Sequence, residues 1–356
     1  MEKIVKLILS LFIFYINMNL GIVGVTGLVG EKILESLNLL NIKYKSLRIF
    51  ASEESKGRIY KIQNEEYICE VFDLKVLNTF DYVILAVEND MARNIIEYKK
   101  INKCKCVIID NSSEYRMDKD IPLIVPEINR KILNSNNKII ASPNCSTTML
   151  VMLLAPLSNI ANIKKVVVST YQAASGAGKK GLNELLVQTK EYVEEKELTK
   201  DYWGKQYIYN VFSHNSKINE NFYNQEEMKI INETRKILNI PYLIINPTCV
   251  RVPTLTSHCL SVNVLFDKEV EFHKIYDKLN NFPGIKIEEH HNTNKYPEAI
   301  DSNNKIDILV GRIRPELDED GMFNYNSWNF FVSGDQLLKG AAYNSVQILK
   351  YMTLFY

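Results

Sequence analysis

The feature that most constrains the fold is a glycine-rich turn near the start of the chain. An apolar run typical of a buried strand, Leu20–Val25, leads into the turn, and apolar residues then recur at helical spacing across 31–40. Glycine lets the backbone approach a pyrophosphate closely where a helix begins. Such turns also serve packing alone, but the strand before and the helix after favour a dinucleotide site. We expect this site to include Gly24, Thr26, Gly27, Leu28, Val29 and Gly30.

The same alternation of strand and helix continues through the first half of the chain. Strands are expected at 47–51, 82–87 and 107–110, which predicts a parallel sheet with helices on both faces. From about Pro143 the pattern changes to one that predicts a mixed or antiparallel sheet. In this half we expect a helix at 183–197, a strand at 242–245, a surface loop at 290–305 and a last helix that begins at Gly340. Because 356 residues suffice for two cores, we predict a doubly wound, Rossmann-type nucleotide-binding domain and an α+β substrate and dimerisation domain. The predicted bounds are 18–143 with 335–356, and 144–334.

Charge and cysteine content narrow the class of protein. A formal net charge of +1 offers no footprint for nucleic acid or an anionic membrane, so neither partner is expected. The six cysteines include no Cys-x-x-Cys pair, so no metal site is expected, and scattered thiols suit a reducing compartment such as the cytoplasm. The apolar run at 7–16 is too short to span a bilayer. We expect 1–17 to be a non-functional extension, with Met18 as an alternative start.

Cys145 is the candidate nucleophile. It lies two residues after Pro143, where the apolar helix 147–157 is predicted to begin. Unpaired amides and the positive end of the helix dipole favour the thiolate at that position, and the same amides could stabilise an oxyanion. A small buried thiol is the alternative interpretation, and position alone does not decide between the two.

A second glycine loop follows the strand predicted at 166–172. Gln172 ends that strand and could orient a reacting group. The loop after it contains Ser175 and Gly176, where the backbone permits a nicotinamide to approach closely. Taken alone, however, a glutamine at such a position is more often a surface residue.

One further segment contains an arginine and a histidine with suitable chemistry. Arg251 can clamp a carboxylate, and His258 can shuttle a proton near neutral pH. Cys259 follows His258 directly, but neighbours on a strand face opposite sides and should not serve one site. The other four histidines, which include His214, are expected to have structural roles.

Together these motifs resemble the aspartate-β-semialdehyde dehydrogenase family. The matching segments follow one another in the family's order, and the resemblance covers essentially everything from Asn19 onward. The box Ser-Pro-Asn-Cys-Ser-Thr at 142–147 is the most specific of them, since glyceraldehyde-phosphate dehydrogenases and acetylglutamyl-phosphate reductases carry different boxes. The segments are 24–30, 142–147, 171–178, 226–229, 249–258 and 338–342.

The resemblance implies a defined reaction. Cys145 would attack the aldehyde of L-aspartate 4-semialdehyde, with His258 as general acid/base and Gln172 positioning the reacting groups. Hydride would pass to NADP⁺, and phosphate would cleave the resulting thioester to L-4-aspartyl phosphate. Biosynthesis runs the reverse direction, toward lysine through diaminopimelate and toward threonine and methionine. The family is also usually homodimeric, so a homodimer is expected.

Binding roles follow from the same resemblance. Arg251 would hold the α-carboxylate of the substrate, and Glu226 its ammonium group. Arg116 and Lys229 would bind phosphate, with Asn144 nearby. Considered singly, the charged side chains among these are also compatible with a solvated surface, and Glu226 and Lys229 are spaced as a simple helical ion pair.

Cofactor preference is less constrained than the reaction. Ser52 and Ser55 follow the predicted second strand, where a 2′-phosphate would bind, and they predict NADP. The family often has arginine where this chain has Glu54, so NAD is also possible. Gln336 stands where the family commonly has asparagine near the nicotinamide, and we expect it to contact the cofactor.

Two other classes of protein compete with this interpretation. A reductase of another acyl phosphate, such as acetylglutamyl phosphate, is disfavoured because Arg251 and Glu226 suit a free amino acid. A catalytically silent nucleotide-binding sensor would be expected to lack a central residue. The chain retains all four: Cys145, Gln172, Arg251 and His258.

Overall fold

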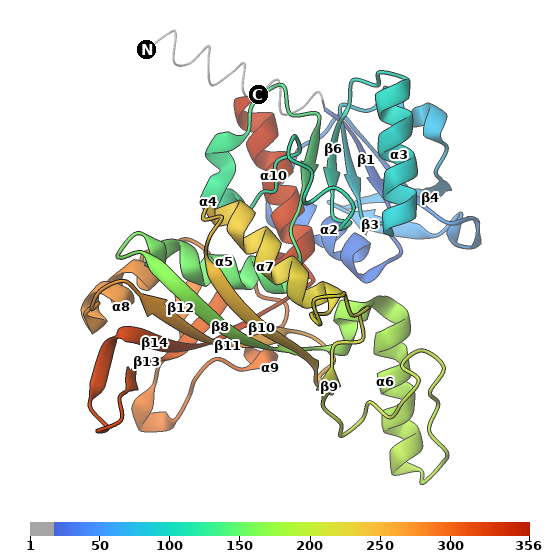
Figure 1. Ribbon diagram of the computed structural model, residues 1–356. Coiled ribbons are helices and arrows are strands. Elements are labelled where there is room, and N and C mark those ends of the chain that lie inside the picture. Colours follow the sequence, from blue (N-terminus) through green and yellow to red (C-terminus); the bar gives the residue numbers. More distant parts are fainter. Residues whose placement is uncertain (1–17) are drawn as a thin grey trace. The chain divides into compact units, whose positions relative to one another are not determined.

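The computed structural model describes residues 18–356, so the expectation for 1–17 lies outside it. The described chain forms two compact units, 18–143 with 341–356 and 144–340 (Figure 1). The chain thus returns to its first unit at Ala341, whereas sequence patterns place this return at about 335. Within 18–356 no helix combines the length and apolar character needed to cross a membrane.

The first unit is built on a seven-stranded sheet in the order β3-β4-β2-β1-β5-β6-β7. Neighbouring strands are parallel except for β3 and β4. Because β1 lies between β2 and β5, the chain winds outward first on one side of β1 and then on the other. The strands are β1 (Asn19–Val23), β2 (Ser46–Ala51), β3 (Ile59–Ile62), β4 (Glu65–Val71), β5 (Tyr82–Leu85), β6 (Val107–Asp110) and β7 (Ile139–Ala141).

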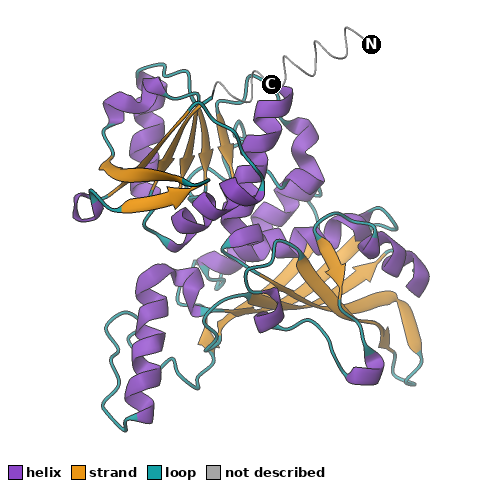
Figure 2. Cartoon of the chain, turned by 180° about the vertical axis from the view of Figure 1, so that it is seen from behind, coloured by secondary structure: helices purple, strands orange, loops and turns teal. Residues whose placement is uncertain are grey.

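Helices cover both faces of this sheet (Figure 2). α2 (Leu28–Leu39) and α10 (Tyr343–Phe355) share one apolar core with Ile22 of β1. α3 (Asn89–Ile101) shares the other core with Val23, because successive side chains of a strand face opposite sides. The doubly wound nucleotide-binding fold predicted from sequence is therefore confirmed. A short helix, α4 (Pro126–Asn129), completes the unit.

The second unit contains a mixed sheet in the order β12-β13-β14-β11-β8-β10-β9. β8 pairs in parallel with β10, and β12 with β13, while the remaining pairs are antiparallel. This arrangement confirms the α+β prediction for the second half. The strands are β8 (Ile163–Gln172), β9 (Phe212–Ser213), β10 (Ile244–Arg251), β11 (His258–Phe266), β12 (Ile285–Ile287), β13 (Ile308–Leu317) and β14 (Phe323–Gly334).

One face of this second sheet is covered by helices. α5 (Cys145–Ser158) packs against α7 (Gln225–Leu238) and α8 (Phe272–Asn280) as well as against several strands (Figure 1). On the opposite face, Val167 and Tyr171 of β8 keep more than a third of their surface exposed. The remaining helices of the unit are α6 (Gly178–Val193) and α9 (Ala299–Ser302).

Some elements differ from the sequence-based predictions in their bounds. The strand predicted at 242–245 extends to Arg251, and Pro247 is tolerated because β9 pairs with only the last two residues of β10. The helix predicted at 183–197 is α6, which starts and ends earlier. The loop predicted at 290–305 contains α9. The last helix, predicted to begin at Gly340, instead follows a π-helical segment, Leu338–Ala342.

Candidate active site

Cys145 is the first residue of α5. Helix formation begins here because Asn144 caps the helix, its side-chain oxygen accepting a hydrogen bond from Thr147 N at 3.1 Å. The rest of α5 as far as Leu157 is buried, whereas Cys145 is partly accessible. Gly340 lies against it, since an added Cβ would come within 2.9 Å of the Cys145 Cβ. The thiol therefore lies, partly accessible, at the start of a helix, a position at which reactive cysteines are commonly found.

α7 holds the start of α5 through two buried carboxylates. Asn144 N donates to Glu233 Oε2 at 2.6 Å, and Asn144 Nδ2 donates to Glu226 Oε1 at 2.7 Å. The two acids are two helical turns apart and face the same side of α7. α7 itself begins with a capping box between Asn224 and Glu227. The carboxylate at Glu226 is thus tied to the residue that caps the helix of Cys145.

Glu226 remains ionised although it is buried. Burial alone would raise its pKa, but Lys229, His214 and the hydrogen bond from Asn144 outweigh burial and lower the pKa to about 2. Lys229 Nζ lies 3.2 Å from Glu226 Oε2 and is about one-third exposed. The pair is therefore no simple surface ion pair, because one partner is buried and bonded to other groups.

Gln172 ends β8 in a buried position. Its Nε2 donates to Ser146 Oγ at 3.0 Å and to Glu226 Oε1 at 3.3 Å. The surface alternative for Gln172 is therefore wrong. The amide connects the first turn of α5 with the carboxylate on α7, so these groups form one network.

Arg251 lies beside Gln172 because β10 and β8 pair with these two residues in register. Its Nη1 donates to Ala173 O at 3.0 Å, and its Nη2 lies 2.8 Å from His214 Nε2. The guanidinium also lies over the ring of Trp203, 5.5 Å from the centroid. Nε of Arg251 is buried and has no hydrogen-bond partner among the described residues.

His258 is completely buried at the first residue of β11. Its Nδ1 accepts a hydrogen bond from Ala173 N at 3.0 Å, so the proton of the neutral ring resides on Nε2. Burial and the charge of Arg251 lower the pKa of His258 to about 3, which keeps the ring neutral. Nε2 has no partner within the described part of the chain.

Cys259 serves a different part of the sheet. Its thiol donates to Ser333 Oγ at 3.5 Å, and burial raises its pKa. This contact agrees with the prediction that His258 and Cys259 do not share a site.

The second glycine loop is connected through Gln336 to Ser257, the residue before β11. Gln336 Oε1 accepts from Ser257 N at 2.8 Å, and Gln336 Nε2 donates to Ser175 Oγ at 2.5 Å. Gly176 passes close to the site, since an added Cβ would lie 2.9 Å from two ring atoms of His258. All three predicted cofactor residues of this unit therefore lie in or beside the network of His258.

The predicted dinucleotide turn lies in the first unit. Gly24 has φ +92°, and a Cβ there would come within 2.2 Å of Ala86 O. A Cβ at Gly30 would similarly lie 2.1 Å from Gly24 O. α2 begins with Gly27 as its N-cap, and no side chain caps it. Thr26, Leu28 and Val29, the other predicted residues of the turn, are half-buried beside it.

The remaining predicted residues also belong to the first unit. Ser52 is exposed and precedes a short 3₁₀ turn, Glu53–Ser55, in which Ser55 is buried. Glu54 is exposed. Arg116 is buried, so it is no solvated charge, and its Nη2 donates to Asn111 O at 2.8 Å.

Sequence reasoning missed two residues that contact Arg251. The sequence predicts a structural role for His214, and Trp203 is not among the predicted site residues. Neither lies within a recognisable motif, and each meets Arg251 only because the chain between α6 and α7 folds back along β10. A histidine and a tryptophan in a long connection between helices were the only available signal.

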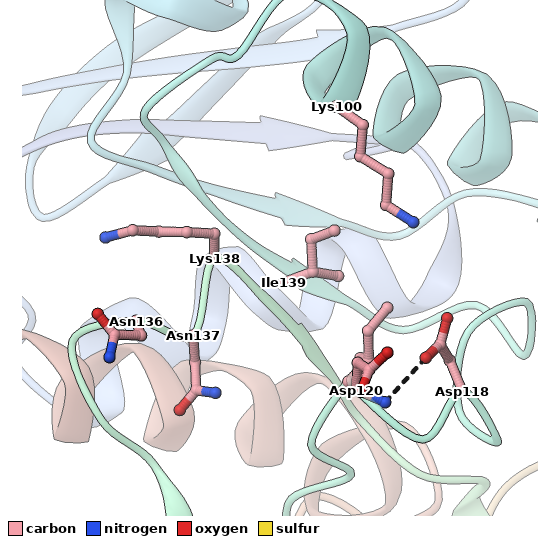
Figure 3. Close-up of a pocket in the computed structure, with 8 residues that line it drawn as sticks. Lys100, Asp118, Asp120, Asn136, Asn137, Lys138 and Ile139 are labelled. Carbon is pink, nitrogen blue, oxygen red and sulfur yellow. Dashed lines mark hydrogen bonds between the residues drawn. The ribbon is translucent and has the colours of Figure 1, made fainter.

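A cavity of about 340 Å³ in the first unit lies beside the start of β7 (Figure 3). Its walls carry both signs of charge, from Lys100 and Lys138 and from Asp118 and Asp120. Asp118 accepts a hydrogen bond from Asp120 N at 2.9 Å. No predicted site residue lines this cavity.

Comparisons with known proteins identify the family. Residues 19–135 match a family model described as "Semialdehyde dehydrogenase, NAD binding domain", and 154–339 match "Semialdehyde dehydrogenase, dimerisation domain". Aspartate-semialdehyde dehydrogenase of Prochlorococcus marinus is 39% identical over 331 residues, which are 93% of this chain and 94% of that protein. The enzyme of Bacillus subtilis is 34% identical over 340 residues, covering 93% and 96%.

Solved structures agree with the sequence comparisons. The crystal structure of aspartate semialdehyde dehydrogenase II from Vibrio cholerae, complexed with ASA, has a TM-score of 0.88 and 32% identity. The match covers 96% of this chain and 99% of that one. The NADP complex from Candida albicans, with a TM-score of 0.71 and 19% identity, shares the fold. The chain belongs to the aspartate-semialdehyde dehydrogenases, oxidoreductases of amino-acid biosynthesis that interconvert L-4-aspartyl phosphate and L-aspartate 4-semialdehyde.

Proposed function

We propose that Cys145 is the nucleophile of this reaction and that Arg251, Glu226 and His258 bind its substrate. The observation that carries the proposal is a pair of buried nitrogens, Nε of Arg251 and Nε2 of His258, without partners among the described residues. A buried N–H that lacks a partner costs free energy, so a ligand or a water that accepts its hydrogen bond would be stabilised there. A guanidinium edge suits the α-carboxylate, and a single N–H suits the oxygen of the reacting carbonyl.

We propose the following course for the reaction. The Cys145 thiolate adds to the aldehyde carbon, and the electrons of the carbonyl bond move to its oxygen. The His258 Nε2–H and the first amides of α5 stabilise that oxyanion. A bound dinucleotide supplies the acceptor for the hydride. Loss of the hydride leaves a thioester on Cys145, and phosphate attacks it to release the thiolate and the acyl phosphate.

The tautomer of His258 bears on the role that we propose for this residue in the reaction. Sequence resemblance implies a general acid/base, which requires that Nε2 can lose its proton. The hydrogen bond from Ala173 N favours a proton on Nε2, where it stabilises the substrate oxygen. Because an alkoxide can lose hydride directly, the thiolate route balances without a proton on the substrate oxygen. We therefore propose that His258 acts chiefly as a neutral hydrogen-bond donor.

Substrate and phosphate roles are distributed over charged groups. Glu226, ionised by its neighbours, would bind the substrate ammonium. Lys229, paired with Glu226, and Arg116 of the first unit would bind phosphate. Gln172 and Asn144 would position Glu226 and the start of α5, since both donate to the same carboxylate oxygen, Oε1.

The first unit has the features that a dinucleotide requires. Gly24 and Gly30 leave no space for a Cβ, and the uncapped start of α2 presents backbone amides. We propose that NADP is preferred, with its 2′-phosphate near Ser52 and Ser55, and that NAD is also used because Glu54 is nearby. A cradle of backbone amides binds the pyrophosphate of either dinucleotide, so this preference depends on the loop after β2.

We also propose a cytoplasmic homodimer. The exposed face of the second sheet carries Val167 and Tyr171 of β8 and lies within the segment that matches the dimerisation model. Such a face favours a self-complementary contact between two copies. The cysteines form no disulfide among residues 18–356, which suits a reducing compartment.

One assay tests the proposed function. Purified protein is incubated with L-aspartate semialdehyde and NADP⁺, with and without phosphate, beside Cys145→Ser. We expect phosphate-dependent reduction of NADP⁺ in the wild type and at least about a thousandfold loss in the variant, the scale of removing a covalent nucleophile. Full activity in Cys145→Ser would contradict the covalent route. The same assay with NAD⁺ measures the preference for the dinucleotide.

A further inference from the structure

His214 lies beside Arg251 because of strand pairing. β9 runs antiparallel to the end of β10, with Phe212 opposite Arg251. His214 follows β9 directly and continues the ladder, since its N–H donates to Cys249 O at 2.8 Å. The backbone of His214 is thus fixed relative to Arg251 before any side-chain contact forms.

The side-chain contact determines the protonation of His214. A guanidinium has donors only, so His214 Nε2, 2.8 Å from Arg251 Nη2, has to accept the hydrogen bond. The proton of the neutral ring then lies on Nδ1, 3.1 Å from Ser216 Oγ. Ser216 N lies 3.2 Å from Nδ1 and could donate to it only in the opposite tautomer. In that tautomer Nε2 would carry the proton, so Nε2–H and the guanidinium would both be donors and could not form a hydrogen bond.

Charge around His214 supports the neutral form. Burial, followed by the positive charge of Arg251, lowers the pKa of His214 to about 4, with Lys229 acting in the same direction and Glu226 against it. A protonated ring would place a second cation against the guanidinium and remove its acceptor. At neutral pH the ring therefore remains an acceptor.

The acceptor completes the support of Arg251. Ala173 O binds Nη1, His214 binds Nη2, and the ring of Trp203 covers the guanidinium. Three contacts in different directions fix the guanidinium plane and leave Nε without a partner among the described residues. A pre-oriented guanidinium loses less entropy when it binds a carboxylate.

We propose that His214 is a positioning residue that sets the orientation of Arg251 for the substrate α-carboxylate through its unprotonated Nε2. This inference rests on the proposed function, in which Arg251 binds that carboxylate. Removing the acceptor leaves the guanidinium free to rotate, and the loss should affect binding of substrate rather than the chemistry at Cys145.

The test compares two substitutions of similar size. His214→Gln supplies an oxygen acceptor near the position of Nε2, whereas His214→Met has the same length and no comparable acceptor. We expect the KM for L-aspartate semialdehyde to rise roughly tenfold in His214→Met, the cost of one hydrogen bond to a charged group, with kcat within about threefold of wild type. His214→Gln should restore KM to within about threefold of wild type. The alkylation rate of Cys145 by iodoacetamide should stay unchanged in both variants.

The outcomes separate this inference from the proposed function. If the wild type shows no phosphate-dependent activity, the proposed function fails. If the wild type is active and His214→Met keeps its KM, or if His214→Gln is as impaired as His214→Met, the positioning role is overturned. Nitrogen NMR of histidine-labelled wild type gives a test that requires no variant to fold. A proton on Nδ1 of His214 between pH 6 and pH 8 supports the inference, and a proton on Nε2 overturns it.

Discussion

Gly176 offers a sharp test of the geometry around His258 and Arg251. It lies in the 3₁₀ turn Ala174–Ala177 that follows β8. A Cβ at this position would lie 2.9 Å from both Cε1 and Nε2 of His258 and 3.0 Å from Nη1 of Arg251. Carbon and nitrogen atoms in contact normally keep a separation of about 3.5–4.0 Å. Gly176→Ala therefore forces both side chains to move.

The size of the effect follows from these distances. To regain an ordinary contact, the His258 ring has to retreat by roughly 0.6 Å, the difference between the normal separation and the 2.9 Å contact. That displacement strains the 3.0 Å hydrogen bond between Ala173 N and Nδ1. Misplacing a catalytic group by about 1 Å can cost about a hundredfold in rate. Because the displacement is smaller than about 1 Å, we expect kcat/KM of Gly176→Ala to fall by roughly tenfold to a hundredfold. Overpacking should also cost about 1–3 kcal/mol in the free energy of unfolding.

Gly321→Ala is the matched control. Gly321 has φ +76°, and nothing lies within 4 Å of the added Cβ. The change strains the backbone by about 1–2 kcal/mol but touches no residue of the proposed site. Both variants should therefore unfold at lower urea concentration, and only Gly176→Ala should lose kcat/KM for the semialdehyde. A folded Gly176→Ala enzyme within about threefold of wild-type kcat/KM would refute the proposed geometry.

Four further predictions address other parts of the chain. Gly340→Ala should slow the reaction of Cys145 with iodoacetamide by several-fold, since the added Cβ would lie 2.9 Å from the Cys145 Cβ, and an unchanged rate would argue against that contact. Glu54→Arg should raise the ratio of kcat/KM for NADP⁺ to kcat/KM for NAD⁺ by roughly tenfold, because arginine binds a 2′-phosphate. An unchanged ratio would show that the 2′-phosphate binds elsewhere. The pKa values of His214 and His258, about 4 and about 3, lie below the ordinary 6.5. Below pH 6.5 the unfolded chain therefore binds protons that the folded chain does not, and the free energy of unfolding falls as the pH is lowered from 6.5 toward 4 and 3. Urea titrations should show a loss on the order of 4 kcal/mol between pH 7 and pH 5, about half of it absent in His214→Gln, and an equal loss in that variant would contradict the buried neutral ring. Phe222, 90% exposed with φ +67°, should tolerate Phe222→Gly with equal or higher stability because relief of backbone strain offsets the flexibility of glycine, and a loss above about 1 kcal/mol would show that its side chain has a packing role.

Local patterns were sufficient to predict the fold and the starts and ends of the elements that carry several of the candidate residues. The glycine turn after β1 is encoded by short-range sterics, since Gly24 and Gly30 leave no space for a side chain. The start of α5 is equally local, because Asn144 caps the helix that follows it. Gln172 and Arg251 end strands that pair in register, but the strand of Arg251 was predicted to end at 245, so only the family resemblance implied that the two residues share a site.

Contacts made by residues in long connections between regular elements could not be predicted from such patterns. His214 reaches Arg251 only through the two-residue strand β9, which has too few residues for a recognisable alternation. The tautomer of His258 depends on the amide of Ala173, which is invisible in a sequence motif. The family motif thus identifies the groups that we propose to bind the substrate, whereas their protonation and orientation are set by backbone groups and by a histidine outside any motif. This division predicts that transplanting Cys145, Gln172, Arg251 and His258 onto a related scaffold would transfer the residues but not their orientation, unless the backbone at Ala173 and the chain that carries His214 came with them.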